Sequence, residues 1–324
     1  MKRALQTARS ATSGNPAYGM LHTAISEALK HLKAPPPISD ESIHDARKSL
    51  KKARAALRLL QDGMSKHTYE TENSGLRDAG RFLSPFRDAR SLIDAFDSLH
   101  DRYSDKLQGV NLAPLQKILH ANLTKARRHF LHTPTELKSC IRLLKDCTTL
   151  AKKEEFSSID SETIETGLRR IYRKGFKART EAEVARTPEA LHEWRKQVKY
   201  LLNAVEDLHP SEKGSVVKIL KWIDQLADCL GNDHDLAMLS QEIARGTYAS
   251  VNSEVIKTLH GLIDRRRTKL QKKAFSLGEK LYDWKSKRFT QRILKQISPA
   301  SPTAAAPSVR KSSPTNGRQQ KIGS

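Results

Sequence analysis

The sequence predicts an all-α fold, and three of its features support this class. Apolar residues recur with the 3.6-residue period of an amphipathic helix along nearly the whole chain. Runs of β-branched or aromatic residues are rare. Several candidate helix starts combine a capping side chain with a proline, whose missing N–H does no harm in a first turn. The 324 residues are enough for one large domain or two ordinary ones.

Helix starts and breaks can be assigned in order along the chain from capping residues, prolines and glycines. Residues 1–16 are expected to be a disordered leader, and residues 298–324, which are basic and rich in Pro, Ser and Ala, a disordered tail. Helix starts are predicted at Asp40-Glu41, at Ser84-Pro85 and at Thr187-Pro188-Glu189. Breaks are predicted at Pro35-Pro36-Pro37, Gly109, Thr133-Pro134, Ser157-Ser158, His209-Pro210 and Gly231-Asn232.

The chain also contains an internal repeat. "IHDARKSLKKARAALRLL" from Ile43 aligns with "LHEWRKQVKYLLNAVEDL" from Leu191, at an offset of 148. "LSPFRDARSLI" from Leu83 aligns with "LGNDHDLAMLS" from Leu230, at an offset of 147. Two landmarks with nearly the same offset indicate a duplicated unit, with its boundary near residue 155.

Each copy carries a row of cations along one side of a helix. On a helical wheel, the first stripe falls within an arc of about 80° and consists of His44, Arg47, Lys51, Arg54 and Arg58. The second stripe consists of His192, Arg195 and Lys199. Apolar arcs adjoin both stripes: Ile43, Ala46, Leu50, Ala53, Leu57 and Leu60 in the first copy, and Leu191, Trp194, Val198, Leu201, Val205 and Leu208 in the second.

These stripes have two interpretations. Like charges at these spacings destabilise a helix by a few tenths of a kcal/mol per pair, so an anion outside the chain would offset the repulsion. Alternatively, the cations are solvated side chains beside an apolar face. The repetition of the pattern, with a histidine at the head of each stripe, favours ligand binding.

Composition indicates the class of partner. A formal charge of +22, from 58 Lys and Arg against 36 Asp and Glu, attracts polyanions such as nucleic acid, acidic membranes or phosphate polymers. Cys140, Cys147 and Cys229 form no disulfide or zinc pattern and are interpreted as core residues in a reducing compartment. No apolar run approaches the roughly 20 residues that span a bilayer. We therefore expect a cytoplasmic protein with no membrane partner.

The candidate binding residues include the two stripes and nearby cations. Asp88 and Asp235 are supporting candidates, which either stabilise a helix N-terminus or orient a histidine or arginine of a stripe. The full candidate set for anion binding is His44, Arg47, Lys48, Lys51, Lys52, Arg54, Arg58, Arg169, Arg173, Lys177, His192, Arg195, Lys196, Lys199 and Arg266.

Three motifs together resemble a known family. "HDARKSLKKAR" and "HEWRKQVK", with "YRKGFKA" before the second copy, closely resemble the CHAD domain, the conserved-histidine α-helical domain, over roughly residues 17–297. The resemblance implies two four-helix bundles related by a pseudo-twofold axis, over 17–155 and 156–297, and binding of inorganic polyphosphate in a central basic cavity. It places the binding role on His44, Arg47, Lys51, Lys52 and Arg54, and on His192, Arg195 and Lys199. The second copy departs from the family pattern at Leu202 and Phe176, where basic residues are usual.

Three function classes follow from these observations. The first is a non-catalytic polyphosphate-binding protein, because rows of Arg and Lys match a linear chain of phosphates; the family also suggests association with polyphosphate granules. The second is a nucleic-acid binder, although aromatic residues for base stacking are few, at 6% of the chain. The third is a metal-dependent phosphohydrolase, which the absence of a phosphate-loop or paired-histidine motif disfavours. We therefore expect no catalysis, no cofactor and no metal, and we leave open a homo-oligomer.

Overall fold

The computed structural model describes residues 16–33, 38–132, 134–150, 160–209, 215–245 and 251–295. Within these ranges the chain forms twelve α-helices and one short 3-10 helix, with no strand, so the predicted all-α class is confirmed. None of the helices in these ranges is both long enough and apolar enough to cross a bilayer. The predicted leader before residue 16, the tail from residue 298, the breaks at residues 35–37 and 157–158 and the repeat boundary near residue 155 lie outside the described residues.

The first half of the chain begins and breaks its helices close to the predicted positions. Ser39 caps the helix that starts at Asp40 by accepting a hydrogen bond from the Ser42 N–H at 3.0 Å. Gly109 adopts a positive φ of 78° in the predicted break. The helices are α2 (Pro16–Leu32), α3 (Asp40–Leu60), η1 (Gln61–Gly63), α4 (Lys66–Phe82), α5 (Ser84–Arg102), α6 (Ser104–Leu107), α7 (Ala113–His132) and α8 (Pro134–Leu150).

The second half agrees with the prediction except at one break. Thr187 caps the helix that starts at Pro188, as the sequence predicts. The break predicted at Gly231-Asn232 is wrong, because one helix runs through both residues. A single interior glycine costs a helix only about 1 kcal/mol, and packing on both sides offsets that. The helices are α9 (Ser161–Ala185), α10 (Pro188–Leu208), α11 (Ser215–Ala244), α12 (Ser253–Tyr282) and α13 (Ser286–Leu294).

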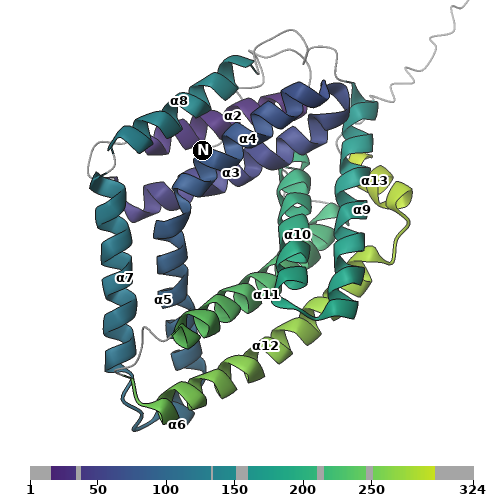
Figure 1. Cartoon of the computed structure of the whole chain (residues 1–324). Coiled ribbons are helices and arrows are strands. Elements are labelled where there is room, and N and C mark those ends of the chain that lie inside the picture. The colour runs from purple at the N-terminus through teal and green to yellow at the C-terminus, as the bar shows by residue number, and fades with distance from the viewer. Residues whose placement is uncertain are drawn as a thin grey trace, which may run out of the picture.

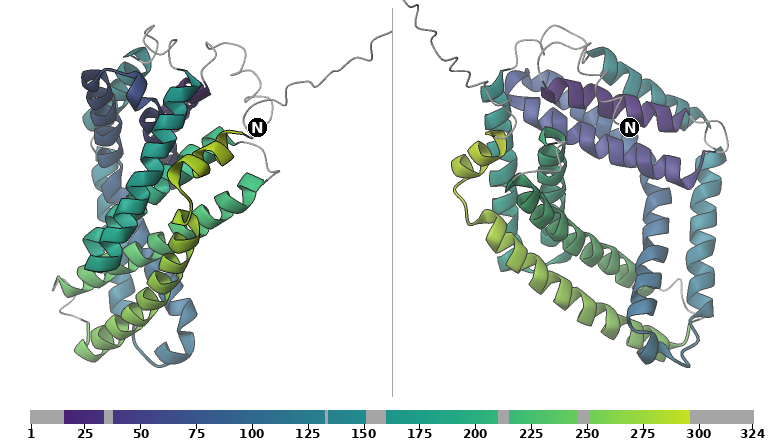
Figure 2. Two further views of the ribbon diagram at one scale, coloured as in Figure 1. Left: turned by 90° about the vertical axis from the view of Figure 1, so that its right-hand side faces the viewer. Right: turned by 180° about the vertical axis from the view of Figure 1, so that it is seen from behind.

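The helices are arranged as a four-sided frame (Figure 1). One side contains α2, α3, α4 and α8, and the next contains α5 and α7; α11 with α12 and α9 with α10 complete the other two sides. The view from behind shows the same four sides (Figure 2). Helices α3, α5, α10 and α11 therefore border the middle of the frame, and this arrangement positions the candidate site.

Two sets of four helices form closed circuits of packed neighbours. In the first, α2 packs on α3, α3 on α4, α4 on α8 and α8 on α2. In the second, α9 packs on α10, α10 on α11, α11 on α12 and α12 on α9. The sets meet where α3 contacts α9 and α10. Helix α5, which packs on α7 outside the first set, contacts α11 of the second set. This grouping agrees with the expectation of two four-helix units, while the pseudo-twofold relation between them stays a prediction.

The predicted apolar arcs form the core. Every residue of the arcs on α3 and α10 is buried, and Trp194 is among the largest fully buried side chains. The halves approach closely at Gly167, where an added β-carbon would lie 2.3 Å from the Leu59 carbonyl oxygen. Cys140, Cys147 and Cys229 are all buried and free, as predicted.

Candidate anion-binding site

Side chains from four helices meet in one group of charges. We call this group the central cluster: Arg47 and Lys51 of α3, Arg87 and Asp88 of α5, Arg195 and Lys199 of α10, and Asp235 of α11. The side chain of Lys51 is exposed to solvent, but its ammonium group is crowded by protein. Desolvation, followed by repulsion from Arg195, Arg47, Lys199 and Arg87, lowers the pKa of Lys51 to about 8. The two stripes predicted from the repeat therefore act on each other across the frame.

Arg47 is fixed where α4 ends and α5 begins. Its Nη1 donates to the Ser84 hydroxyl at 2.6 Å and to the Gly80 carbonyl at 3.2 Å. Its Nη2 lies 4.0 Å from Asp88 Oδ1. Ser84 and Asp88 belong to the first turns of α5, so the predicted helix start at Ser84-Pro85 is what positions both groups beside the first stripe.

Arg195 occupies the corresponding place in the second half. Asp235 is the charge that most strongly offsets the desolvation of Arg195, and Gly231 leaves the guanidinium room, since an added β-carbon there would lie 3.8 Å from Nε. This Nε is buried and has no hydrogen-bond partner among the described residues. Asp235 lies in the middle of α11 and not near a helix start, so the helix-terminus interpretation of this residue is wrong. Guanidinium N–H groups donate strong charge-assisted hydrogen bonds to anionic oxygens, so Arg195 adds donors to the cluster.

The carboxylates of the cluster are outnumbered by cations. Removal from bulk water raises the pKa of both Asp88 and Asp235, although Arg47 and Arg195 respectively pull in the opposite direction. The cluster contains five Lys or Arg side chains and two carboxylates, so it retains an excess of positive charge when all are ionised. This charge is held together by the fold and is not neutralised within the described residues of the cluster.

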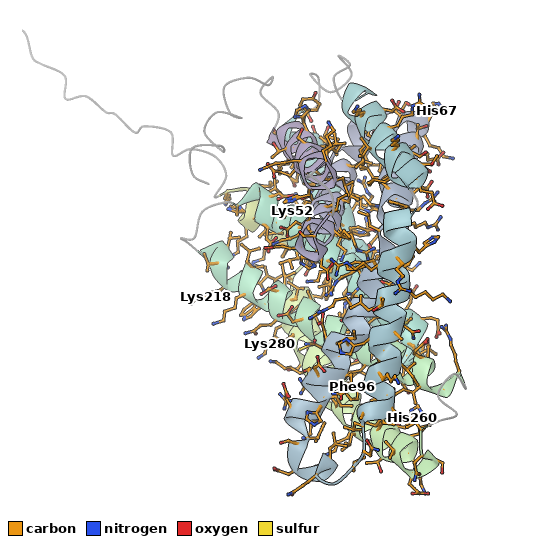
Figure 3. The ribbon with its side chains drawn as sticks, turned by 90° about the vertical axis from the view of Figure 1, so that its left-hand side faces the viewer. Lys52, His67, Phe96, Lys218, His260 and Lys280 are labelled. Atoms are coloured by element: carbon orange, nitrogen blue, oxygen red, sulfur yellow. The ribbon has the colours of Figure 1, made fainter. Side chains whose placement is uncertain are left out.

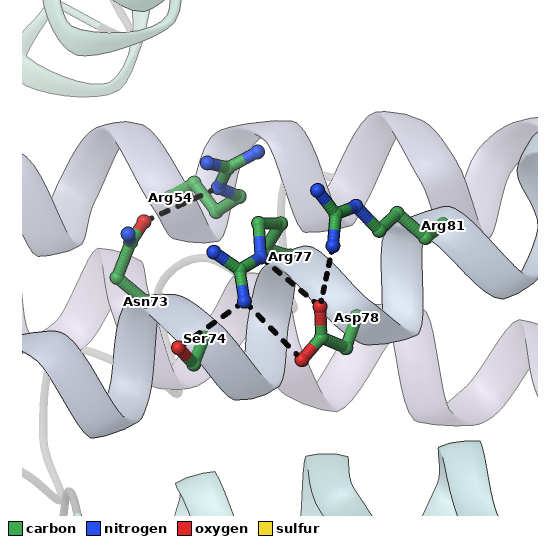
Figure 4. A network of polar contacts seen from close by, with 6 residues as sticks. All are labelled: Arg54, Asn73, Ser74, Arg77, Asp78 and Arg81. Atoms are coloured by element: carbon green, nitrogen blue, oxygen red, sulfur yellow. Dashed lines mark hydrogen bonds and ion pairs between the residues drawn. The ribbon is translucent and has the colours of Figure 1, made fainter.

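The far end of the first stripe turns away from the central cluster. The guanidinium of Arg58 lies 3.8 Å from the ring centre of Tyr200, and that of Arg54 lies 5.8 Å from it. Arg54 Nε also donates to the Asn73 side chain at 3.4 Å. Figure 4 shows this bond beside a second network on α4, in which Arg77 and Arg81 both contact Asp78. Arg54 and Arg58 thus help to join α3, α4 and α10.

Other predicted binding residues lie apart from the central cluster. Lys52 Nζ lies 3.5 Å from Asp207 Oδ1, at the contact between α3 and α10 (Figure 3). Arg169, Lys177 and Lys196 form ion pairs with Glu165, Glu181 and Glu193 on their own helices. Lys48 and Arg173 are exposed, and Arg266 lies near Arg102 and Tyr103 at the end of α5.

His44 and His192 lie at the heads of their stripes, beside the cluster. Burial, followed by repulsion from Arg87, lowers the pKa of His44. Burial, followed by repulsion from Arg195 and Lys196, lowers the pKa of His192. Both histidines are exposed enough to meet a ligand.

Sequence reasoning missed Arg87 and His234. Each directly precedes a predicted supporting carboxylate, and each faces the histidine at the head of a stripe, His44 or His192. The repeat that pairs Asp88 with Asp235 also pairs position 87 with position 234. The repeat could therefore have identified both residues, but the first copy has an arginine and the second a histidine at this position. In the described ranges, no three His, Cys, Asp or Glu residues are placed so that they could hold a metal ion.

Comparisons with known proteins place this arrangement in a family. The model of the CHAD domain matches residues 23–244, which is well over half of the chain. The solved structure of PptA from Streptomyces chartreusis is similar with a TM-score of 0.62 at 15% identity, covering 85% of this chain and 100% of that one. The CHAD domain from the plant Ricinus communis is similar with a TM-score of 0.52 at 16% identity, covering 86% and 90%. No curated protein sequence gives a significant match. The family match includes both histidine-led helices and all residues of the central cluster, and the chain therefore belongs to the CHAD domain family.

Proposed function

We propose that this protein binds inorganic polyphosphate at the central cluster and does not hydrolyse it. The observation that carries the proposal is the excess of cations drawn from four helices, whose repulsion adds to desolvation in lowering the pKa of Lys51. Folded chains rarely hold like charges together without an anionic partner, because the repulsion opposes folding. A flexible chain of phosphates could contact both stripes at once. Membership of the CHAD family supports the same ligand.

The arrangement favours a phosphate polymer over nucleic acid. Tyr200, the aromatic residue beside Arg54 and Arg58, is buried and already covered by these guanidinium groups. It therefore offers no free face on which a base could stack. Phosphate groups need only positive charge and hydrogen-bond donors, which the Lys and Arg side chains of the cluster supply. We also propose a cytoplasmic location, with association at polyphosphate granules.

A competition experiment tests the proposal. Labelled long-chain polyphosphate is bound to the protein at fixed salt and displaced with unlabelled polyphosphate or with single-stranded DNA of equal charge. We expect polyphosphate to compete at much lower concentration, and incubation with Mg²⁺ or Mn²⁺ to release no phosphate. Stronger competition by DNA would favour a nucleic-acid binder, and metal-dependent phosphate release would identify an enzyme.

A further inference from the structure

The second half of the central cluster adjoins a pair of facing histidines. His192 of α10 and His234 of α11 have their Nδ1 atoms 3.3 Å apart and their ring centres 4.5 Å apart. His192 is exposed, and His234 is partly buried. Two neutral rings that face each other in this way share one proton, because one Nδ1 must donate and the other accept.

Such a pair can gain one further proton without losing its contact. The ring that donates through Nδ1 has a free Nε2, which can take a proton from solvent and make that ring an imidazolium. A second added proton would place two N–H groups against each other at the shared contact. The geometry therefore permits the uptake of one proton and opposes the uptake of two.

The first half has a different pair at the same positions. The repeat aligns His44 with His192 and Arg87 with His234. Arg87 stays charged at all physiological pH values, so the first half needs no proton to present a cation beside its histidine. In the second half, the same position holds a group whose charge depends on pH.

The surroundings keep the second pair neutral in the free protein. Burial, followed by repulsion from Arg195 of α10, His192 and Arg267 of α12, lowers the pKa of His234 to about 4. Around His192, Lys196 adds to the repulsion and Glu193 opposes it. On α11, Asp235 follows His234 directly and Asp233 is bound to Arg267 at 3.1 Å. A phosphate placed beside these rings would favour the protonated form, since opposite charges nearby stabilise it.

We propose that His192 and His234 form a proton-coupled phosphate subsite, where the binding of a phosphate group is accompanied by the uptake of one proton from solvent at an imidazole Nε2. In the first half, Arg87 stands where the second half has His234, so His44 has no second ring with which to share a proton. This inference rests on the proposed function, and it adds that the two halves of the site respond differently to pH.

Calorimetry in buffers of different ionisation enthalpy tests the coupling. Long-chain polyphosphate, which has few titrating ends, is added at pH 6.5 to the wild type, to His234→Arg and His234→Gln, and to the control His67→Gln, an exposed histidine of α4 outside the cluster. For the wild type and His67→Gln, we expect a binding heat that varies with the buffer and corresponds to about one proton. For both His234 variants we expect that dependence to disappear. Affinity should be kept or raised in His234→Arg and reduced in His234→Gln.

A second measurement needs no substitution. In protein labelled at histidine with ¹⁵N, polyphosphate at pH 6.5 should move the ring signals of one histidine of this pair toward those of imidazolium. One bound proton implies that affinity falls by up to about tenfold per unit rise in pH where uptake occurs. Binding without buffer dependence, or unchanged dependence in His234→Arg, would overturn the subsite and leave the proposed function intact. Failure of the wild type to bind polyphosphate would overturn both.

Discussion

At the scale of single residues, the positive charge of Lys51 should lower the stability of the fold and favour the proposed anion binding. Its pKa is lowered from 10.5 to about 8, so the unfolded chain binds more protons than the folded chain between these values. Stability should therefore rise as the pH increases through this window. Below it, the repulsion is fully present in the folded state. The residue thus opposes folding at neutral pH, and binding of the proposed anion would offset this effect.

Replacing Lys51 by Met should separate the two effects. The variant keeps the length of the side chain and removes its charge, so we expect an unchanged or higher melting temperature at pH 7, together with weaker binding of polyphosphate. Thermal unfolding and a binding titration measure both quantities. A lower melting temperature with unchanged affinity would contradict the placement of Lys51 in an anion site.

At the scale of helices, the helical-wheel analysis of α3 and α10 predicted their buried faces correctly but not the contacts of all their cations. Positions on one helix follow from its 3.6-residue period, so the apolar arcs could be assigned from sequence. The period does not reveal which neighbour a cation meets. Lys52 pairs with Asp207 and Arg58 stacks on Tyr200 because α10 crosses α3 at these positions. The helical period contains no information about where two helices cross.

The apolar face of α3 should govern stability and not binding. Leu50 is only 2% exposed, and its truncation to Ala should cost about 3 kcal/mol of unfolding free energy, as other buried leucine truncations do. Denaturant unfolding measures this loss. Polyphosphate affinity, measured under conditions where the variant is folded, should stay close to that of the wild type. A large loss of affinity in the folded variant would show that the two faces of α3 are not independent.

A buried glutamate of α4, Glu72, should make the stability of the fold depend on pH in a second way. Glu72 is 1% exposed, and its pKa is raised by burial from 4.5 to about 7. The folded chain binds the extra proton between these values, so stability should fall as the pH rises from about 4.5 to about 7 and then level off. The loss should be on the order of 2–3 kcal/mol.

Glu72→Gln supplies the control for that effect. The amide cannot ionise, so its unfolding free energy should depend less on pH and should exceed that of the wild type at pH 8. Urea unfolding at pH 5 and pH 8 measures the difference. Equal pH dependence in the two proteins would show that another group is responsible.

For the whole molecule, the repeat in the sequence identified two matching stripes but not how four helices would meet. The offset identified α3, α10 and the carboxylates at Asp88 and Asp235. The frame, in which α5 and α11 complete the cluster, depends on contacts between segments more than 100 residues apart, such as α5 with α11. Such contacts depend on packing of whole faces, which one sequence does not specify by pattern alone.

Binding of a long chain by the whole cluster should depend steeply on salt. If Z phosphate charges are neutralised, the logarithm of affinity should fall with the logarithm of salt with a slope of about −0.7Z, by analogy with single-stranded nucleic acid. Each cation removed from the cluster should make this slope less steep by about 0.7. A slope near zero would indicate that uncharged contacts dominate.

Cations from both halves should form one site, and a titration of long-chain polyphosphate into matched variants tests this arrangement. Lys51→Gln removes a charge from α3 and Lys199→Gln removes one from α10. The control is Lys280→Gln, an exposed residue in the last turn of α12, which contributes no residue to the cluster. We predict a single binding event that Lys51→Gln and Lys199→Gln both weaken and Lys280→Gln leaves unchanged. Two separate binding events, each weakened by only one of the two cluster variants, would contradict this arrangement.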